Sequence, residues 1–103
     1  MIVQNTDSCY ISSIMIKTTL HIINKLGLHA RASAKFVSAA SRFQSNLDIT
    51  KGTQTVNGKS IMGVMMLAAS KGTELTVQID GPDEIEMEKY LRDLVNNRFG
   101  EPE

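Results

Sequence analysis

The spacing of apolar residues changes at Gly27, and this change constrains the fold more than any other feature of the chain. Before Gly27, apolar residues recur mostly at every second position, which predicts a half-buried strand that ends near Asn24 and Lys25. Over residues 30–43 they recur at helical spacing, which predicts a helix with His29 at or near its N-cap. The strand positions are Ile14, Ile16, Leu20 and Ile22, and the helix positions are Phe36, Val37, Ala40 and Phe43.

A hairpin and a short helix are predicted next. β-prone runs at residues 47–49 and around Val56 flank Lys51-Gly52-Thr53, whose glycine favours a tight turn. Ser60 is a preferred N-cap residue and begins a predicted helix of about two turns over residues 61–67.

The last part of the chain predicts one more strand and one more helix. Apolar and polar residues alternate over residues 73–79, and Gly81-Pro82 ends this strand. The helix that follows has a buried stripe made of Met87, Tyr90, Leu91, Leu94 and Val95.

This order of elements predicts an α+β fold, an open-faced β-sandwich of the βαββαβα type. A strand–helix–strand crossover cannot pair as an adjacent hairpin, so the last strand inserts antiparallel between the first two. The sheet then has four antiparallel strands with three helices on one face. We expect one domain over residues 15–99 and a short tail over residues 100–103. Residues 1–14 are expected to be a disordered extension or to reflect the choice of a translation start upstream of Met15.

Composition excludes several classes of function. Eleven acidic and eleven basic side chains give a formal net charge of zero, so no global field draws the chain to nucleic acid or to an anionic membrane. The single cysteine excludes an internal disulfide, and the absence of a Cys/His cluster at ligand spacing excludes a structural zinc site. No apolar run reaches bilayer length. We expect a cytoplasmic monomer without metal or cofactor.

His29 is the candidate reactive residue. A helix start presents unpaired N–H groups and the positive end of the helix dipole, which together favour an anion. A neutral imidazole can attack phosphorus, and nearby Arg31 supplies a fixed positive charge and several hydrogen-bond donors for phosphate oxygens. This pattern favours a phosphohistidine site, although a histidine in such a place is also often only a packing or capping residue. His21, on the opposite parity of the first strand, is expected to face solvent.

Two motifs in order, Gly27-Leu28-His29-Ala30-Arg31 and Lys59-Ser60-Ile61-Met62-Gly63-Val64-Met65, make the chain resemble the HPr family of histidine phosphocarriers and its nitrogen-branch paralogues. The resemblance implies that His29 takes a phosphoryl group on Nδ1 from phosphorylated Enzyme I and passes it to an EIIA-type protein. Such a protein is a stoichiometric carrier of the phosphotransferase system and not an enzyme. It serves sugar transport or nitrogen and carbon regulation.

The same resemblance implies roles for the residues around His29. Backbone N–H groups of Ala30 and Arg31 hold the phosphate oxygens, and the Arg31 guanidinium adds charge. Because a carrier must release its phosphate, we expect a shallow, exposed site with no large cavity. Many members have proline after the arginine, whereas this chain has Ala32, which leaves one more N–H at the helix start.

The second motif suggests regulation and docking. Ser60 stands where the family is phosphorylated by an HPr kinase/phosphorylase, although its preference for the N-cap also explains its presence. Ile61, Met62 and Met65 are expected to dock on Enzyme I while Val64 and Leu67 pack inward.

Two other classes of function compete with the carrier. A small acylphosphatase-like enzyme would use a related sandwich, but the chain lacks a glycine-rich signature after the first strand. A regulatory binding domain would keep the fold and use His29 only as a cap. Substitution of His29 distinguishes these readings, because a binding domain would keep its full effect.

Overall fold

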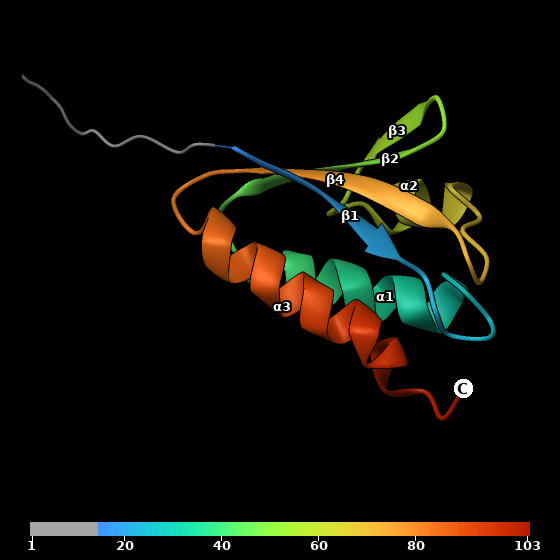
Figure 1. Cartoon of the computed structure of the whole chain (residues 1–103). Helices are drawn as coiled ribbons and strands as arrows, with labels where there is room; N and C mark the ends of the chain where they lie inside the picture. Colours follow the sequence, from blue (N-terminus) through green and yellow to red (C-terminus); the bar gives the residue numbers. More distant parts are fainter. Residues whose placement is uncertain (1–14) are drawn as a thin grey trace, which may run out of the picture.

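The structure is a computed structural model that describes residues 15–103, and the predicted extension over residues 1–14 lies outside the described residues. The element order is strand, helix, strand, strand, helix, strand, helix, as the sequence predicts, followed by one turn of 3-10 helix. The bounds are β1 Ile16–His21, α1 Ala30–Ala40, β2 Asn46–Lys51, β3 Gln54–Asn57, α2 Ile61–Met66, β4 Glu74–Asp80, α3 Glu84–Asn96 and η1 Arg98–Gly100 (Figure 1).

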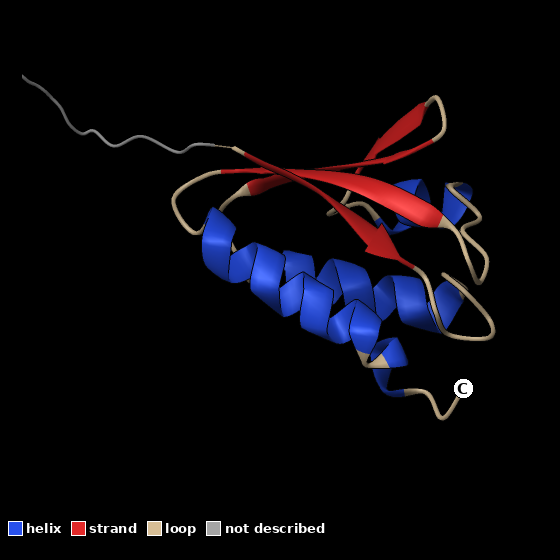
Figure 2. Ribbon diagram, viewed as in Figure 1, coloured by secondary structure: helices blue, strands red, loops and turns tan. Residues whose placement is uncertain are grey.

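The sheet has the predicted topology. Its strand order is β1-β4-β2-β3, and every neighbouring pair is antiparallel. The last strand is therefore central, and Ile79 of β4 faces Ile16 of β1 on one side and Leu47 of β2 on the other. The helices cover one face of this sheet, which confirms the open-faced α+β sandwich (Figure 2).

The core fills the space between the sheet and the helices. Alternation along β4 sends Leu75, Val77 and Ile79 inward, and all three are buried. They meet Phe36 of α1 and a buried stripe on α3 that consists of Met87, Leu91 and Val95. This one core fixes the ends of the helices relative to the sheet.

Three sequence predictions need correction. β1 ends at His21, and the chain then turns through a loop in which Asn24 is fully buried. α1 ends at Ala40 with Ser41 as its C-cap, because the donors after Ser41, the Arg42 and Phe43 N–H groups, bond three residues back and tighten the chain into a turn. Tyr90 is 39% exposed rather than buried, since its hydroxyl accepts a hydrogen bond from Arg42 at 2.6 Å.

Other local predictions are confirmed. His21 faces solvent, and a turn at Gly52 and Thr53 joins β2 to β3. Ser60 caps α2, since its Oγ accepts a hydrogen bond from the Gly63 N–H at 3.1 Å. Val64 is buried. Within residues 15–103, no helix is both long enough and apolar enough to span a bilayer.

Candidate functional site

The loop between β1 and α1 brings His29 to the surface at the start of α1. Gly27 in this loop has a φ of +66°, and a Cβ at this position would lie 2.3 Å from the Ala69 carbonyl oxygen. The next residue, Leu28, donates its N–H to that same oxygen at 2.8 Å. Because only glycine permits this close approach, the loop packs tightly against the segment after α2 and holds His29 in place.

His29 is the N-cap residue of α1, as the sequence predicts, but its ring makes no capping hydrogen bond. The first helical hydrogen bond runs from the Ser33 N–H to the His29 carbonyl at 2.8 Å, so the N–H groups of Ala30, Arg31 and Ala32 precede the helical ladder. The first turn of α1 has no acidic residue. No acidic residue of α1 itself therefore offsets the positive end of the helix dipole beside the imidazole.

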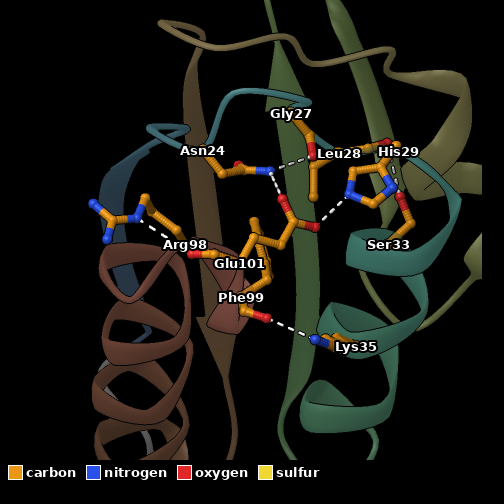
Figure 3. A network of polar contacts seen from close by, with 9 residues as sticks. All are labelled: Asn24, Gly27, Leu28, His29, Ser33, Lys35, Arg98, Phe99 and Glu101. Atoms are coloured by element: carbon orange, nitrogen blue, oxygen red, sulfur yellow. Dashed lines mark hydrogen bonds and ion pairs between the residues drawn. The ribbon is translucent and has the colours of Figure 1, made fainter. Parts of the chain in front are cut away.

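The His29 ring is held by Glu101, a residue from the far end of the chain. Nε2 of His29 bonds Oε2 of Glu101, and the two side chains are 28% and 13% exposed (Figure 3). Because a carboxylate only accepts hydrogen bonds, this contact puts the ring proton on Nε2 and the lone pair of the neutral ring on Nδ1. Nδ1 is thus the ring nitrogen whose lone pair the Glu101 contact does not engage.

Glu101 is itself held by Asn24. The Asn24 Nδ2 donates to Glu101 Oε1 at 2.9 Å and to the Gly27 carbonyl at 2.8 Å (Figure 3). The hydrogen bond from Asn24, followed by the one from His29, lowers the pKa of the Glu101 carboxyl below its ordinary value. Glu101 therefore stays an anion next to the imidazole.

An unusual chain reversal places Glu101 at this site. Arg98, Phe99 and Gly100 all have left-handed backbone angles, with φ of 54°, 55° and 80°. The Phe99 side chain is buried, and its carbonyl accepts a hydrogen bond from Lys35 Nζ at 2.7 Å. Since two of these residues are not glycine, contacts of this kind must hold the strained turn.

A hollow of about 620 Å³ opens beside the imidazole, so the expectation of no large cavity is corrected. The C-terminal segment 101–103 contributes to its lining, and the Lys25 N–H donates a hydrogen bond to the Glu103 carbonyl at 3.0 Å. The hollow is lined by Lys25, Leu26, His29, Ala30, Arg31, Glu101, Pro102 and Glu103. Basic and acidic side chains thus share the same opening.

The structure groups the predicted site residues into two sets. His29, Ala30 and Arg31 lie together at the hollow. Ser60 and the three predicted docking residues, Ile61, Met62 and Met65, belong to α2 and its cap and do not line it. The docking residues are exposed by 43%, 69% and 40%. Within residues 15–103, no cluster of three or more potential ligands could hold a metal ion.

Sequence reasoning missed Asn24 and Glu101. Asn24 fell at the predicted end of a strand, and Glu101 fell in a segment treated as a tail. Gly100 after a helix signals a chain reversal, but the direction of the returning chain depends on tertiary contacts.

Comparison with known proteins connects this geometry to a family. A family model described as "PTS HPr component phosphorylation site" matches residues 16–97. The phosphocarrier protein HPr of Neisseria meningitidis serogroup B is 57% identical over 89 residues, which are 86% of this chain and all of the relative. HPr from Xylella fastidiosa strain Temecula1 is 53% identical over 84% of this chain and 98% of its own length.

The solved structures agree. The crystal structure of HPr-C-His from Thermoanaerobacter tengcongensis superposes with a TM-score of 0.82 at 44% identity, and covers 85% of this chain and 99% of its own. The phosphocarrier protein HPr from Bacillus anthracis gives a TM-score of 0.76 at 39% identity, and covers 80% of this chain and 98% of its own.

Proposed function

Because the chain belongs to the HPr family of phosphotransferase-system phosphocarriers, we propose that it carries a phosphoryl group on Nδ1 of His29. The donor is phosphorylated Enzyme I and the acceptor is an EIIA-type protein, in sugar transport or in nitrogen or carbon regulation. We place this exchange in the cytoplasm. The observation that carries the proposal is the contact of His29 Nε2 with Glu101, which leaves the Nδ1 lone pair for phosphorus.

The transfer balances without a proton leaving the ring. The Nδ1 lone pair forms a bond to phosphorus while the donor's bond to phosphorus breaks, and that electron pair stays on the donor. Nε2 keeps its proton, so the phosphorylated ring gains a formal positive charge next to the Glu101 carboxylate. In the forward step to the acceptor, the ring leaves as neutral imidazole. The Glu101 carboxylate therefore favours acceptance, and the proton retained on Nε2 favours release, because the leaving group is neutral imidazole and not an imidazolate anion.

The surroundings of His29 suit a transferable phosphate. The N–H groups of Ala30 and Arg31 lie at the helix start and are available for the phosphoryl oxygens. The Arg31 side chain is exposed beside the hollow and adds a mobile positive charge. Because the site opens to solvent, donor and acceptor can reach the same atom in turn.

The exposed side chains of α2 suit a docking role. Ile61, Met62 and Met65 lie on a short helix whose inner side is anchored by buried Val64. Adaptable methionine side chains accommodate different partners, so this surface would contact both Enzyme I and the acceptor. Phosphorylation of Ser60 by an HPr kinase/phosphorylase would add about two negative charges at this surface and weaken an apolar or acidic contact.

The decisive experiment compares the two histidines. Purified protein, His29→Ala and the matched control His21→Ala are incubated with Enzyme I and phosphoenolpyruvate, and intact mass is recorded before and after acid treatment. We expect one acid-labile phosphoryl group on the wild type and on the exposed-histidine control, and none on His29→Ala. Phosphorylation that persists in His29→Ala, or its absence from the wild type with active Enzyme I, would contradict the proposal.

A further inference from the structure

Asn24 is a fully buried amide with an incomplete set of hydrogen bonds. Its exposed fraction is 0%, and its two hydrogen bonds are both donated by Nδ2, to the Gly27 carbonyl and to Glu101 Oε1. Its Oδ1 has no hydrogen-bond partner within residues 15–103. A buried carbonyl without a partner destabilises a fold, so structure alone does not account for an amide at this position.

The orientation of this amide is fixed by its neighbours. A rotation by half a turn would direct Oδ1 at the Gly27 carbonyl and at the Glu101 carboxylate, and both of these groups only accept hydrogen bonds. The donor side of Asn24 therefore faces Glu101. Glu101 in turn directs its second oxygen at His29 Nε2 (Figure 3).

From this chain of contacts, we propose that Asn24 is a positioning residue for phosphoryl transfer, which acts on His29 only through Glu101. The inference rests on the proposed function of His29. Without the Asn24 donor, one carboxylate oxygen of Glu101 loses its protein partner while the other still faces the imidazole. The carboxylate can then rotate toward solvent and Lys25, and the ring loses its fixed orientation and its single proton position.

The alternative is that Asn24 only closes the β1–α1 loop through its bond to the Gly27 carbonyl. A loop role and a positioning role differ in their dependence on Glu101. If Asn24 acts through Glu101, its removal has no further effect on transfer once Glu101 is also absent. If Asn24 acts through the loop, the two losses add.

The experiment is a double-mutant cycle with two readouts. Asn24→Ala, Glu101→Ala and the double variant are compared by the rate of phosphoryl transfer from Enzyme I and by ring ¹⁵N shifts of His29 at a pH where the ring is neutral. In the wild-type background, we expect Asn24→Ala to slow transfer about 5- to 10-fold and to populate the His29 tautomer with the proton on Nδ1. In the Glu101→Ala background, we expect the same substitution to change neither the rate nor the ring shifts further. If Asn24→Ala does not fold, Asn24→Asp takes its place, because it keeps the side-chain volume but removes the amide donors. We expect the same effect from it. Asn96→Ala, an exposed asparagine on α3, is the matched control and keeps the wild-type rate.

Each outcome decides one claim. Wild-type transfer and an unchanged tautomer in Asn24→Ala, or additive losses in the double variant, would overturn the positioning role. Failure of the wild type itself to accept phosphate would instead overturn the proposed function, and the ring shifts would still report whether Asn24 controls the imidazole.

Discussion

Two carboxylates tie together the opposite ends of the antiparallel pair α1 and α3, and they do so in different ways (Figure 1). Asp83, at the N-cap of α3, accepts hydrogen bonds from the N–H groups of Gln44 and Ser45 at 2.9 Å and from Ser45 Oγ at 2.5 Å. Glu101, at the other end, accepts one hydrogen bond from Asn24 and bonds the His29 imidazole. Both carboxyl groups have a lowered pKa.

The two networks differ in how completely they are satisfied. Both oxygens of Asp83 accept hydrogen bonds from the loop between α1 and β2. These contacts join that loop to the start of α3 and involve no titratable partner. The Glu101 network leaves the Asn24 Oδ1 without a partner, depends on left-handed Arg98 and Phe99, and ends at a titratable ring beside an open hollow. With His29 as the proposed phosphoryl carrier, this contrast assigns chemistry to the Glu101 end and stability to the Asp83 end.

The largest difference between the two ends is expected in transfer rate. Glu101→Gln removes the negative charge next to the phosphorylated imidazole, and a hydrogen bond to a charged group contributes about 1.5–3 kcal/mol, so transfer should slow roughly 10- to 100-fold. Asp83→Asn should transfer at the wild-type rate. Rapid-quench measurement with phosphorylated Enzyme I checks both rates. Equal rates for Glu101→Gln and the wild type would contradict a role of Glu101 in phosphoryl transfer.

The second difference concerns the free energy of unfolding and has the opposite order. Asp83→Asn replaces two acceptor oxygens by one and places an amide donor against donors, so we expect a loss of about 1–2 kcal/mol in a urea titration. Glu101→Gln should lose less, because the amide oxygen can still accept the hydrogen bond from Asn24, whereas Asp83 accepts three hydrogen bonds. A larger loss of unfolding free energy in Glu101→Gln than in Asp83→Asn would mean that Glu101, and not Asp83, contributes more to stability.

The third test uses pH. The hydrogen bond from Ser45 is the largest cause that holds the Asp83 pKa below its ordinary value of 3.8. A carboxyl group whose pKa is lower in the folded chain stabilises the fold above its unfolded pKa, and this contribution is lost as pH falls through the folded pKa. The free energy of unfolding should therefore fall below about pH 4, and Asp83→Asn should flatten that fall. Parallel curves for the two proteins would show that Asp83 is not linked to folding.

The smallest expected effect tests how the C-terminal turn is held. Lys35→Met keeps most of the side-chain volume but removes the donor to the Phe99 carbonyl, so we expect a loss of about 0.5–1 kcal/mol in unfolding free energy. Because the turn carries Glu101, transfer should also slow, by about 2-fold. Lys71→Met, at an exposed turn, is the matched control for both measurements. No change in either would mean that Phe99 burial alone fixes the turn.

Much of the fold could be predicted because its signals are local. Alternation identified β4, a serine cap identified α2, and the connection rules placed β4 between β1 and β2. The end of α1 and the exposure of Tyr90 could not be predicted, since they depend on the turn at Arg42 and on its contact with the Tyr90 hydroxyl.

Only the part of the site that is contiguous with His29 in the sequence could be predicted. His29, Ala30 and Arg31 follow one another at a helix start, so a single motif contains them. Glu101 reaches His29 from 72 residues away, through left-handed Arg98 and Phe99, whose residue types do not signal that conformation. The proposed role of Asn24 depends on Glu101, so no sequence pattern around Asn24 could reveal that role.

The most direct test of the account is to locate the phosphorus atom on the ring. Protein with ¹⁵N-labelled histidine is phosphorylated with Enzyme I and phosphoenolpyruvate, and nitrogen–phosphorus coupling is measured by NMR. The account predicts coupling to Nδ1 of His29 and a retained proton on Nε2, where Glu101 bonds the ring. Coupling to Nε2, or phosphorus on a residue other than His29, would contradict it.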